Sequence, residues 1–285
     1  MDLSNGVFDI ADSFMENPRF VNINYEKVHE VKEEIEKAGK PSFSFPTSSE
    51  GTELIGAVLE LVGGSINYCY WYGKHTIRPG DARSSLMWEC VQNAFFNYTF
   101  SVDFETCIER LIKLLAIKRF PLLEERARHL RELVSNGEQF ALDIYKSDKK
   151  DITPHFKELA AGFPGYGSDI FLKRASLYFL QLYRRFGWFN QSLRELHIPA
   201  DYQVPRLMDY RGILEYNREL RYEIDNNILI PKHSQKECEI RSATVLVARD
   251  LCIDLGWNAA DVDGFFWLGA RGIEHPFHLC ITSDY

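Results

Sequence analysis

Two charged side chains have surroundings that suit catalysis. Asp201 lies in "IPADYQVPRLM" (198–208), next to Tyr202 and just ahead of a proline that suits the first turn of a helix. A carboxylate there can cap the helix, and it can also stabilise a developing positive charge or activate a water molecule. Lys173 precedes it by 28 positions. A lysine can bind a phosphate, attack a sugar carbon to form a Schiff base, or simply face solvent.

The lysine follows a glycine-rich turn. The stretch "AAGFPGYGSDIFLKRA" (160–175) indicates the end of one helix, a tight turn and the start of the next. We expect Gly165 and Gly167 to adopt left-handed backbone angles and to present N–H groups to a phosphate. Ser168 or Asp169 should cap the second helix. The Pro-Gly-x-Gly pattern is common in helical turns, and the downstream lysine and aspartate make it more specific.

The segment "SINYCYWYG" (65–73) combines rings with an amide. Asn67 offers both a donor and an acceptor, and aromatic rings can fill a core or stack on a flat heterocycle. Its alternation predicts a strand, in which Tyr68 and Tyr70 share one face while Asn67 and Trp71 share the other. We expect the Asn67/Trp71 face to line a binding site.

The elements that must position these residues are mostly helical. Apolar residues recur at spacings of three and four over 28–35, 53–62, 104–115, 121–137, 169–186, 204–220 and 237–255. A helix stop is expected at the two glycines that follow 53–62. The stretch 277–285 is a second strand candidate. Without a repeat or a linker, the chain predicts one compact α-rich domain over 1–285, of which 1–50 forms an N-terminal elaboration.

Composition narrows the class of protein. The chain has 285 residues, is 45% hydrophobic and carries a net charge of −8, which argues against a general grip on nucleic acid. Six cysteines without CxxC pairs predict buried free thiols in a reducing compartment rather than a metal site. The N-terminus does not resemble a signal peptide, and no stretch is long and apolar enough for a membrane span. We therefore expect a cytoplasmic protein without metal or organic cofactor.

Six segments occur in the order found in one family. Together they resemble the queuosine salvage protein family, the queuosine 5′-phosphate N-glycosylase/hydrolases. The segments are "INYCYW" (66–71), "FPLLEER" (120–126), "FLKRA" (171–175), "ADYQVP" (200–205), "ECEIRSATVLVARDL" (237–251) and "PFHLCITSDY" (276–285). The hairpin before Lys173 resembles that of the helix–hairpin–helix DNA glycosylase superfamily. The resemblance implies a compact helical domain of that kind with a few short strands.

The resemblance also implies a reaction. The bond between ribose C1′ and a 7-deazaguanine base would be hydrolysed, releasing queuine for salvage in tRNA modification, with a small-molecule nucleotide as substrate and no stably bound nucleic acid. Asp201 is the expected catalytic carboxylate. The residues expected to bind substrate are Lys173, Asn67, Trp71, Tyr202, Glu239, Arg241, Gly165, Gly167 and His278. Lys173, Arg241 and the hairpin amides would hold the phosphate, whereas Glu239 and Arg241 lie two apart on a helix, so at most one should face the ligand.

Several alternatives stay open. Gln203 stands where the family usually has arginine, and "FFWLGARG" (265–272) lacks the aspartate that often follows the family's tryptophan. His278 can donate to the sugar or phosphate, or it can be structural. The chain could instead act on a modified base in DNA or on another nucleotide. A non-enzymatic protein that binds a modified nucleotide is a third reading.

Overall fold

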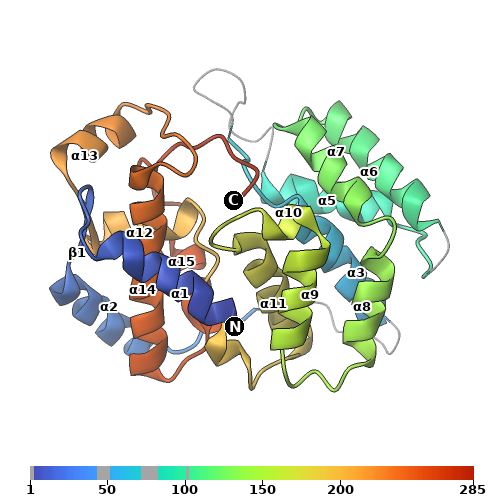
Figure 1. Ribbon diagram of the computed structural model, residues 1–285, viewed down its shortest axis with the longest axis horizontal. Coiled ribbons are helices and arrows are strands. Elements are labelled where there is room, and N and C mark those ends of the chain that lie inside the picture. The colour runs from blue at the N-terminus through green and yellow to red at the C-terminus, as the bar shows by residue number, and fades with distance from the viewer. Residues whose placement is uncertain (1–2, 44–51, 72–82, 101–102) are drawn as a thin grey trace. The chain divides into compact units, whose positions relative to one another are not determined.

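The computed structural model describes residues 3–43, 52–71, 83–100 and 103–285. Helices dominate these residues and the strands are short, so the predicted mainly α class is confirmed (Figure 1). The chain divides into two compact units. The first comprises Met1–Ser44 and Asn190–Ile281, and the second Phe45–Phe189 and Thr282–Tyr285. The predicted domain boundaries stay a prediction.

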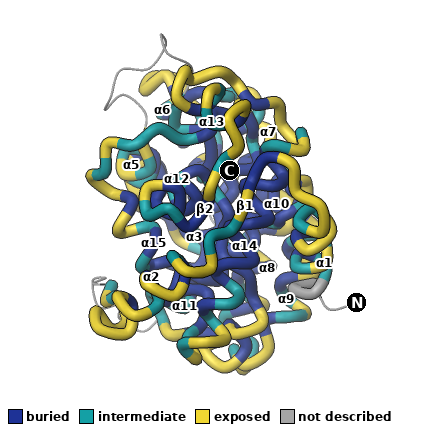
Figure 2. Tube along the Cα trace, turned by 90° about the vertical axis from the view of Figure 1, so that its left-hand side faces the viewer, coloured by how far each residue is buried: buried dark blue, intermediate teal, exposed yellow. Residues whose placement is uncertain are grey.

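The first unit is organised around the long helix α14. Most residues of this helix are buried, and its tube in Figure 2 is mostly dark blue. Helices α1, α2, α12 and α15 pack against it, and so does strand β1. The helices of this unit are α1 (Leu3–Met15), α2 (Tyr25–Ala38), the 3₁₀ turn η1 (Leu193–Glu195), α12 (Gln203–Tyr210), α13 (Arg218–Asp225), α14 (Gln235–Leu255) and α15 (Ala259–Gly269).

A two-stranded antiparallel sheet joins distant parts of this unit. Strand β1 (Val21–Ile23) pairs with β2 (Leu214–Tyr216), with Asn22 opposite Glu215. The helix that follows each strand is capped by an asparagine side chain, Asn24 before α2 and Asn217 before α13. The predicted apolar stripe of α2 is confirmed, because Val28, Val31 and Ile35 are all buried.

The second unit is organised around α3 (Thr52–Ser65), which contacts α5, α7, α8 and α11. The two glycines expected to end this helix lie inside it. A Cβ on Gly63 would meet the Trp88 ring at 2.2 Å, and one on Gly64 would meet the Tyr166 hydroxyl at 2.8 Å. They therefore serve close packing. The other helices are α5 (Ser84–Ala94), α6 (Phe104–Ile117), α7 (Leu123–Glu132), α8 (Gly137–Lys146), α9 (Thr153–Gly162), α10 (Pro164–Gly167) and α11 (Lys173–Phe186).

Two predicted helices are divided in the structure. The segment 121–137 contains α7 and a turn, and Gly137 opens α8 instead of ending a helix. The segment 204–220 contains α12, β2 and the start of α13. Gly212 has a φ of 71°, a left-handed conformation that glycine adopts readily, and it lets the chain turn from α12 toward β2.

The two predicted strands were wrong in the described residues. Residues 66–71 form no regular strand, and 72 and 73 lie outside the described residues. In 277–285 the pairing is limited to one parallel bridge between Leu279 and Leu229. The carbonyl oxygens of residues 66–69 accept instead from side chains, as described below.

The cysteines fit the prediction of free thiols. All six are free, and five of them are buried. The sixth, Cys252, is partly buried. This burial raises the pKa of its thiol to about 12, so the thiol is protonated at neutral pH. In the part of the chain that the structure describes, no helix has the length and apolarity needed to cross a membrane.

Candidate functional site

Asp201 holds the first turn of α12 with one of its two carboxylate oxygens. Its Oδ1 accepts hydrogen bonds from the N–H groups of Gln203 at 2.7 Å and Val204 at 3.2 Å. These are among the first N–H groups of a helix, which lack partners inside it. Within the described residues, Oδ2 makes no hydrogen bond. The predicted capping by Asp201 is confirmed, and it leaves one oxygen available for chemistry.

The main chain before Asp201 is fixed by a buried guanidinium. Arg241 on α14 donates from Nε to the carbonyl oxygen of Ala200 at 3.0 Å and from Nη1 to Glu237 at 3.2 Å. Both charged side chains are fully buried. Losing either one would leave an uncompensated buried charge, so this pair constrains the local backbone firmly. Arg241 was predicted as a phosphate ligand. In the structure its guanidinium is bound to the main chain one residue before Asp201.

His278 is a buried neutral imidazole. Burial, together with the positive charge of Arg241, lowers its pKa to about 3. A histidine with that pKa carries no charge at neutral pH. It therefore cannot attract a phosphate by charge, although a neutral ring can still donate a hydrogen bond.

Glu239 is occupied by the N-terminal segment. Its carboxylate accepts from the N–H groups of Arg19, Phe20 and Val21 at 2.7–3.1 Å, and from the Gln235 amide at 2.8 Å. These contacts anchor the chain that leads into β1. These contacts give Glu239 a structural role, and its binding of substrate stays a prediction.

Tyr202 lies between Asp201 and α12, with its ring stacked on Phe277. The ring centroids are 4.9 Å apart and the planes differ by 23°. Gln203, where the family usually has arginine, accepts from Nη1 of Arg206 at 3.4 Å. The structure thus brings Asp201 and Tyr202 together at the start of α12.

In the second unit, Lys173 opens α11. Asp169 caps the helix as predicted, accepting from the N–H groups of Phe171 at 3.1 Å and Lys173 at 2.9 Å. The Lys173 side chain is buried, and its Nζ donates to the main-chain oxygen of Asn67 at 2.8 Å. The structure therefore joins two predicted binding residues, Lys173 and Asn67, at one place.

The side chains of the Asn67 segment do not alternate as a strand would require. The amide oxygen of Asn67 accepts from the Tyr70 hydroxyl at 3.0 Å, so residues predicted on opposite faces interact. Tyr68 is fully buried, with the guanidinium of Arg126 4.4 Å from its ring centroid. Trp71 is partly exposed, and its carbonyl oxygen accepts from the Cys69 thiol at 3.1 Å.

The carbonyl oxygens of this segment accept hydrogen bonds from a buried arginine instead of from a neighbouring strand. Arg126 donates to the carbonyl oxygens of Ile66, Tyr68 and Cys69, and also to that of Pro121 at 2.7 Å. Buried carbonyl groups need such partners, and the planar fork of arginine supplies several donors at once.

A second buried arginine, Arg174, binds the main chain at the residue before this segment. Arg174 donates from Nη1 to the carbonyl oxygen of Ser65 at 2.6 Å. Arg174 was absent from the predicted site, and so was Arg126. The signal was present, because Arg126 ends "FPLLEER" and Arg174 lies in "FLKRA".

The hairpin glycines do not act as predicted. Gly165 and Gly167 belong to the short helix α10, and neither has a positive φ. The Gly165 N–H donates to the Glu132 carboxylate at 2.8 Å, and the Gly167 N–H donates to the Phe163 carbonyl at 3.1 Å. These N–H groups already have acceptors, and a carboxylate beside one of them disfavours a phosphate. Gly167 is required for another reason, since a Cβ there would meet the Ala160 oxygen at 2.0 Å.

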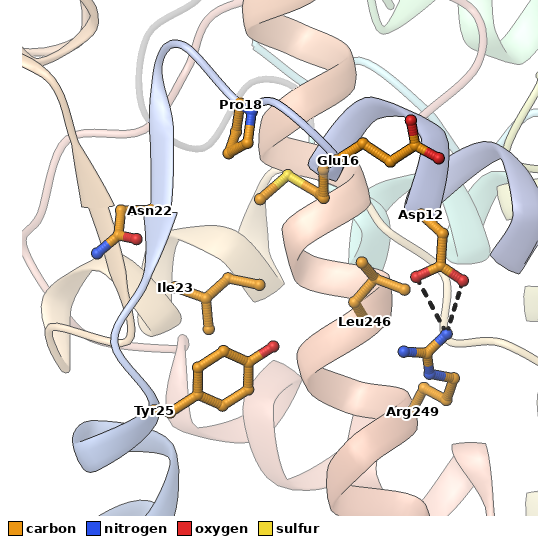
Figure 3. Close-up of a pocket in the computed structure, with 9 residues that line it drawn as sticks. Asp12, Glu16, Pro18, Asn22, Ile23, Tyr25, Leu246 and Arg249 are labelled. Atoms are coloured by element: carbon orange, nitrogen blue, oxygen red, sulfur yellow. Dashed lines mark hydrogen bonds and ion pairs between the residues drawn. The ribbon is translucent and has the colours of Figure 1, made fainter.

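A surface groove of about 390 Å³ lies in the first unit among α1, β1 and α14 (Figure 3). The ion pair between Asp12 and Arg249 lies in it at 3.1 Å, and Tyr25 and Leu246 contribute apolar surface. No residue of the predicted site lines this groove. The predicted site residues thus occur in each unit by itself, Asp201 in the first and Lys173 with Asn67 in the second, and their roles stay predictions.

Comparison with known proteins finds three relatives that share one name. Three curated relatives are named queuosine 5′-phosphate N-glycosylase/hydrolase. The protein of Sphaerobacter thermophilus is 34% identical over 190 residues, covering 58% of each chain. That of Dictyostelium discoideum is 26% identical over 70% of this chain and 66% of its own length. That of Schizosaccharomyces pombe is 24% identical over 59% and 55%. The matches thus span less than two thirds of each relative.

A family model described as queuosine salvage protein matches residues 89–271. This match contains Arg126, Lys173 and Asp201, whose contacts are described above. It covers more than half of the chain, and four of the six segments noted in the sequence lie wholly within it. The chain belongs to the queuosine salvage protein family.

Proposed function

We propose that this protein hydrolyses the N-glycosidic bond of queuosine 5′-phosphate and releases queuine and ribose 5-phosphate. Membership of the family supports the reaction class, and the names of the three relatives support the substrate. The structural observation that carries the proposal is the state of Asp201. One oxygen is immobilised by two amides, and within the described residues the other makes no hydrogen bond.

Asp201 acts at the sugar. When the base departs, positive charge develops on C1′ and the ring oxygen. A fixed carboxylate stabilises that charge without having to reorganise during the reaction. Its Oδ2 also accepts a proton from the water molecule that attacks C1′. The amides of Gln203 and Val204 hold Oδ1, so rotation of the carboxylate is restricted.

The base needs help to leave. A 7-deazaguanine has carbon at position 7, so a proton cannot be delivered there and must reach the O6, N1, N3 or N9 edges. Asn67 serves as a donor to these edges, because the Tyr70 hydroxyl occupies its amide oxygen and thereby sets the orientation of its NH₂ group. Trp71 and Tyr202 provide aromatic surface for the flat base.

Lys173 binds the 5′-phosphate. An ammonium group has three N–H donors, so it can hold the Asn67 carbonyl oxygen and a phosphate oxygen at the same time. The lysine then links recognition of the phosphate to the segment that recognises the base. The proposal does not retain the hairpin amides of Gly165 and Gly167, for which the structure has other acceptors.

The direct test is to incubate the purified protein with queuosine 5′-phosphate and follow the products by chromatography. Queuine and ribose 5-phosphate should appear in equal amounts, and Asp201→Asn should abolish most of their formation. Binding without release would identify a nucleotide-binding protein instead. Tight filter binding of duplex DNA at low salt would favour a glycosylase that acts on polynucleotide. We also expect no borohydride-trapped adduct at Lys173, because water rather than the lysine attacks C1′.

A further inference from the structure

Residues 273–275, near the end of the first unit, form several hydrogen bonds with side chains of α12. Arg206 donates from Nε to the carbonyl oxygen of His275 and from Nη2 to that of Ile273, both at 2.6 Å. The His275 ring also contacts Asp209 on α12, with 2.6 Å between Nε2 and Oδ2. Asp209 is buried and is held in turn by Arg221. Residues 273–275 therefore have a defined position relative to α12.

Two residues further along, Phe277 carries the constraint to Tyr202. The Arg206 guanidinium carbon lies 5.5 Å from the centroid of the Phe277 ring, and the Phe277 ring stacks on Tyr202 with centroids 4.9 Å apart. Guanidinium groups stack favourably on aromatic faces, and near-parallel rings at this separation attract each other. The three side chains contact one another in the order Arg206, Phe277, Tyr202.

This arrangement begins and ends on the same short element. Tyr202 directly follows Asp201, and Arg206 lies one helical turn after Tyr202. Phe277 comes from a distant part of the chain, and its main chain is held close by the two carbonyl contacts of Arg206. The Tyr202 ring thus has an orientation that its own helix alone could not impose.

We propose that Arg206 is a positioning residue that fixes the orientation of the Tyr202 ring through Phe277. This inference rests on the proposed function, in which Tyr202 offers an aromatic face to the base. A ring held in one orientation loses little conformational entropy when a flat heterocycle stacks on it. Arg206 and Phe277 therefore contribute to affinity for the base without touching it, and contribute nothing to affinity for the sugar phosphate.

The test compares inhibition by the two products. Arg206→Met keeps the apolar stem and removes the guanidinium, Phe277→Leu removes the flat face, and Phe277→Tyr keeps it. In the Met and Leu variants we expect the inhibition constant of queuine to rise about tenfold. That of ribose 5-phosphate should stay within about twofold of wild type. Phe277→Tyr should behave like wild type. Arg211→Met is the matched control, since Arg211 directly follows the same helix and, in the part of the chain that the structure describes, forms its ion pair with the exposed Glu34.

Two outcomes would overturn the inference. Equal weakening of both inhibitors would mean that Arg206 merely stabilises α12, and unchanged inhibition by queuine would mean that Phe277 does not set the ring. If the wild-type protein releases no queuine, the proposed function fails separately. The contact between Tyr202 and Phe277 is then tested by the urea unfolding midpoints of Tyr202→Leu, Phe277→Leu and the double variant. Coupled positions should give a midpoint shift smaller than the sum of the single shifts, whereas additive shifts would refute the positioning.

Discussion

Nε of Arg241 lies 3.0 Å from the carbonyl oxygen of Ala200, which fixes the main chain one residue before Asp201. The following amides hold the carboxylate itself, so Asp201 is restrained on both sides in sequence. Preorganisation of this kind is the main way in which enzymes stabilise charge in a transition state. It makes Asp201 the most direct point of attack for mutagenesis.

Replacing Asp201 with asparagine should separate catalysis from folding. The asparagine oxygen can still accept from Gln203 and Val204, so the melting temperature should change little. The negative charge is lost, and kcat should fall by on the order of 100- to 1,000-fold. Asp225→Asn, at the end of α13, is a suitable control. Near wild-type turnover in Asp201→Asn would show that another group performs the chemistry.

Replacing Lys173 with methionine tests recognition of the phosphate. A charge-assisted hydrogen bond contributes about 1.5–3 kcal/mol, so KM for queuosine 5′-phosphate should rise roughly 10- to 100-fold. Kinetics with the nucleoside queuosine, which lacks the phosphate, should stay within about threefold of wild type. If both substrates lose equally, the contribution of Lys173 is its hold on Asn67 instead.

Replacing Glu239 with glutamine should affect stability and leave kinetics alone. The carboxylate accepts from three successive N–H groups at 19–21, and a neutral amide cannot replace all of these bonds. We expect a loss of about 2 kcal/mol and a melting temperature lower by roughly 5 °C. Glu30→Gln on the exposed face of α2 is the control. A rise in KM at unchanged stability would restore Glu239 to the binding site.

Glu60 should make the protein less stable as pH rises. Burial raises its pKa from 4.5 to about 7, although Arg185 at 2.7 Å acts in the opposite direction. The folded chain therefore holds a proton between pH 4.5 and 7 that the unfolded chain releases. The free energy of unfolding should fall by about 1.4 kcal/mol per pH unit across this window. Glu60→Gln should remove that slope in urea titrations and be more stable than wild type at pH 8.

His278 should have the opposite effect at lower pH. Its pKa falls from 6.5 to about 3 on folding, so between these values the unfolded chain binds a proton that the folded chain does not. The free energy of unfolding should therefore decrease as pH falls from 6.5 toward 3, by about 1.4 kcal/mol per unit. The variant His278→Gln should lose this component. An unchanged acid slope in its urea titrations would contradict a buried neutral imidazole.

The sequence predicted features that depend on local chemistry. The stripe of Val28, Val31 and Ile35, the capping by Asp201 and the capping by Asp169 all follow from spacing within one or two turns. The sequence-based predictions were wrong where groups that are distant in the chain determine the local structure. The alternation in 65–73 suggested a strand, but Arg126, far along the chain, satisfies its carbonyl groups.

The glycines were misread for a similar reason. Gly63 and Gly64 were interpreted as a helix stop, and Gly165 and Gly167 as residues with left-handed angles. None of the four has a positive φ. At Gly63, Gly64 and Gly167 a Cβ would collide with atoms of another element, and at Gly165 it would be in tight contact with His129 at 3.0 Å. A single sequence does not distinguish a glycine needed for its backbone freedom from one needed for its small size.

The hold of Arg126 and Lys173 on the oxygens of residues 66–69 has a practical corollary for engineering. The shape of this loop is encoded on α7 and α11, outside the loop itself. Side chains at Asn67 and Trp71 can therefore be exchanged to accept a different heterocycle while the loop keeps its course. A library that varies these two positions and leaves Arg126 and Lys173 untouched should retain folded members, whereas randomising Arg126 should not.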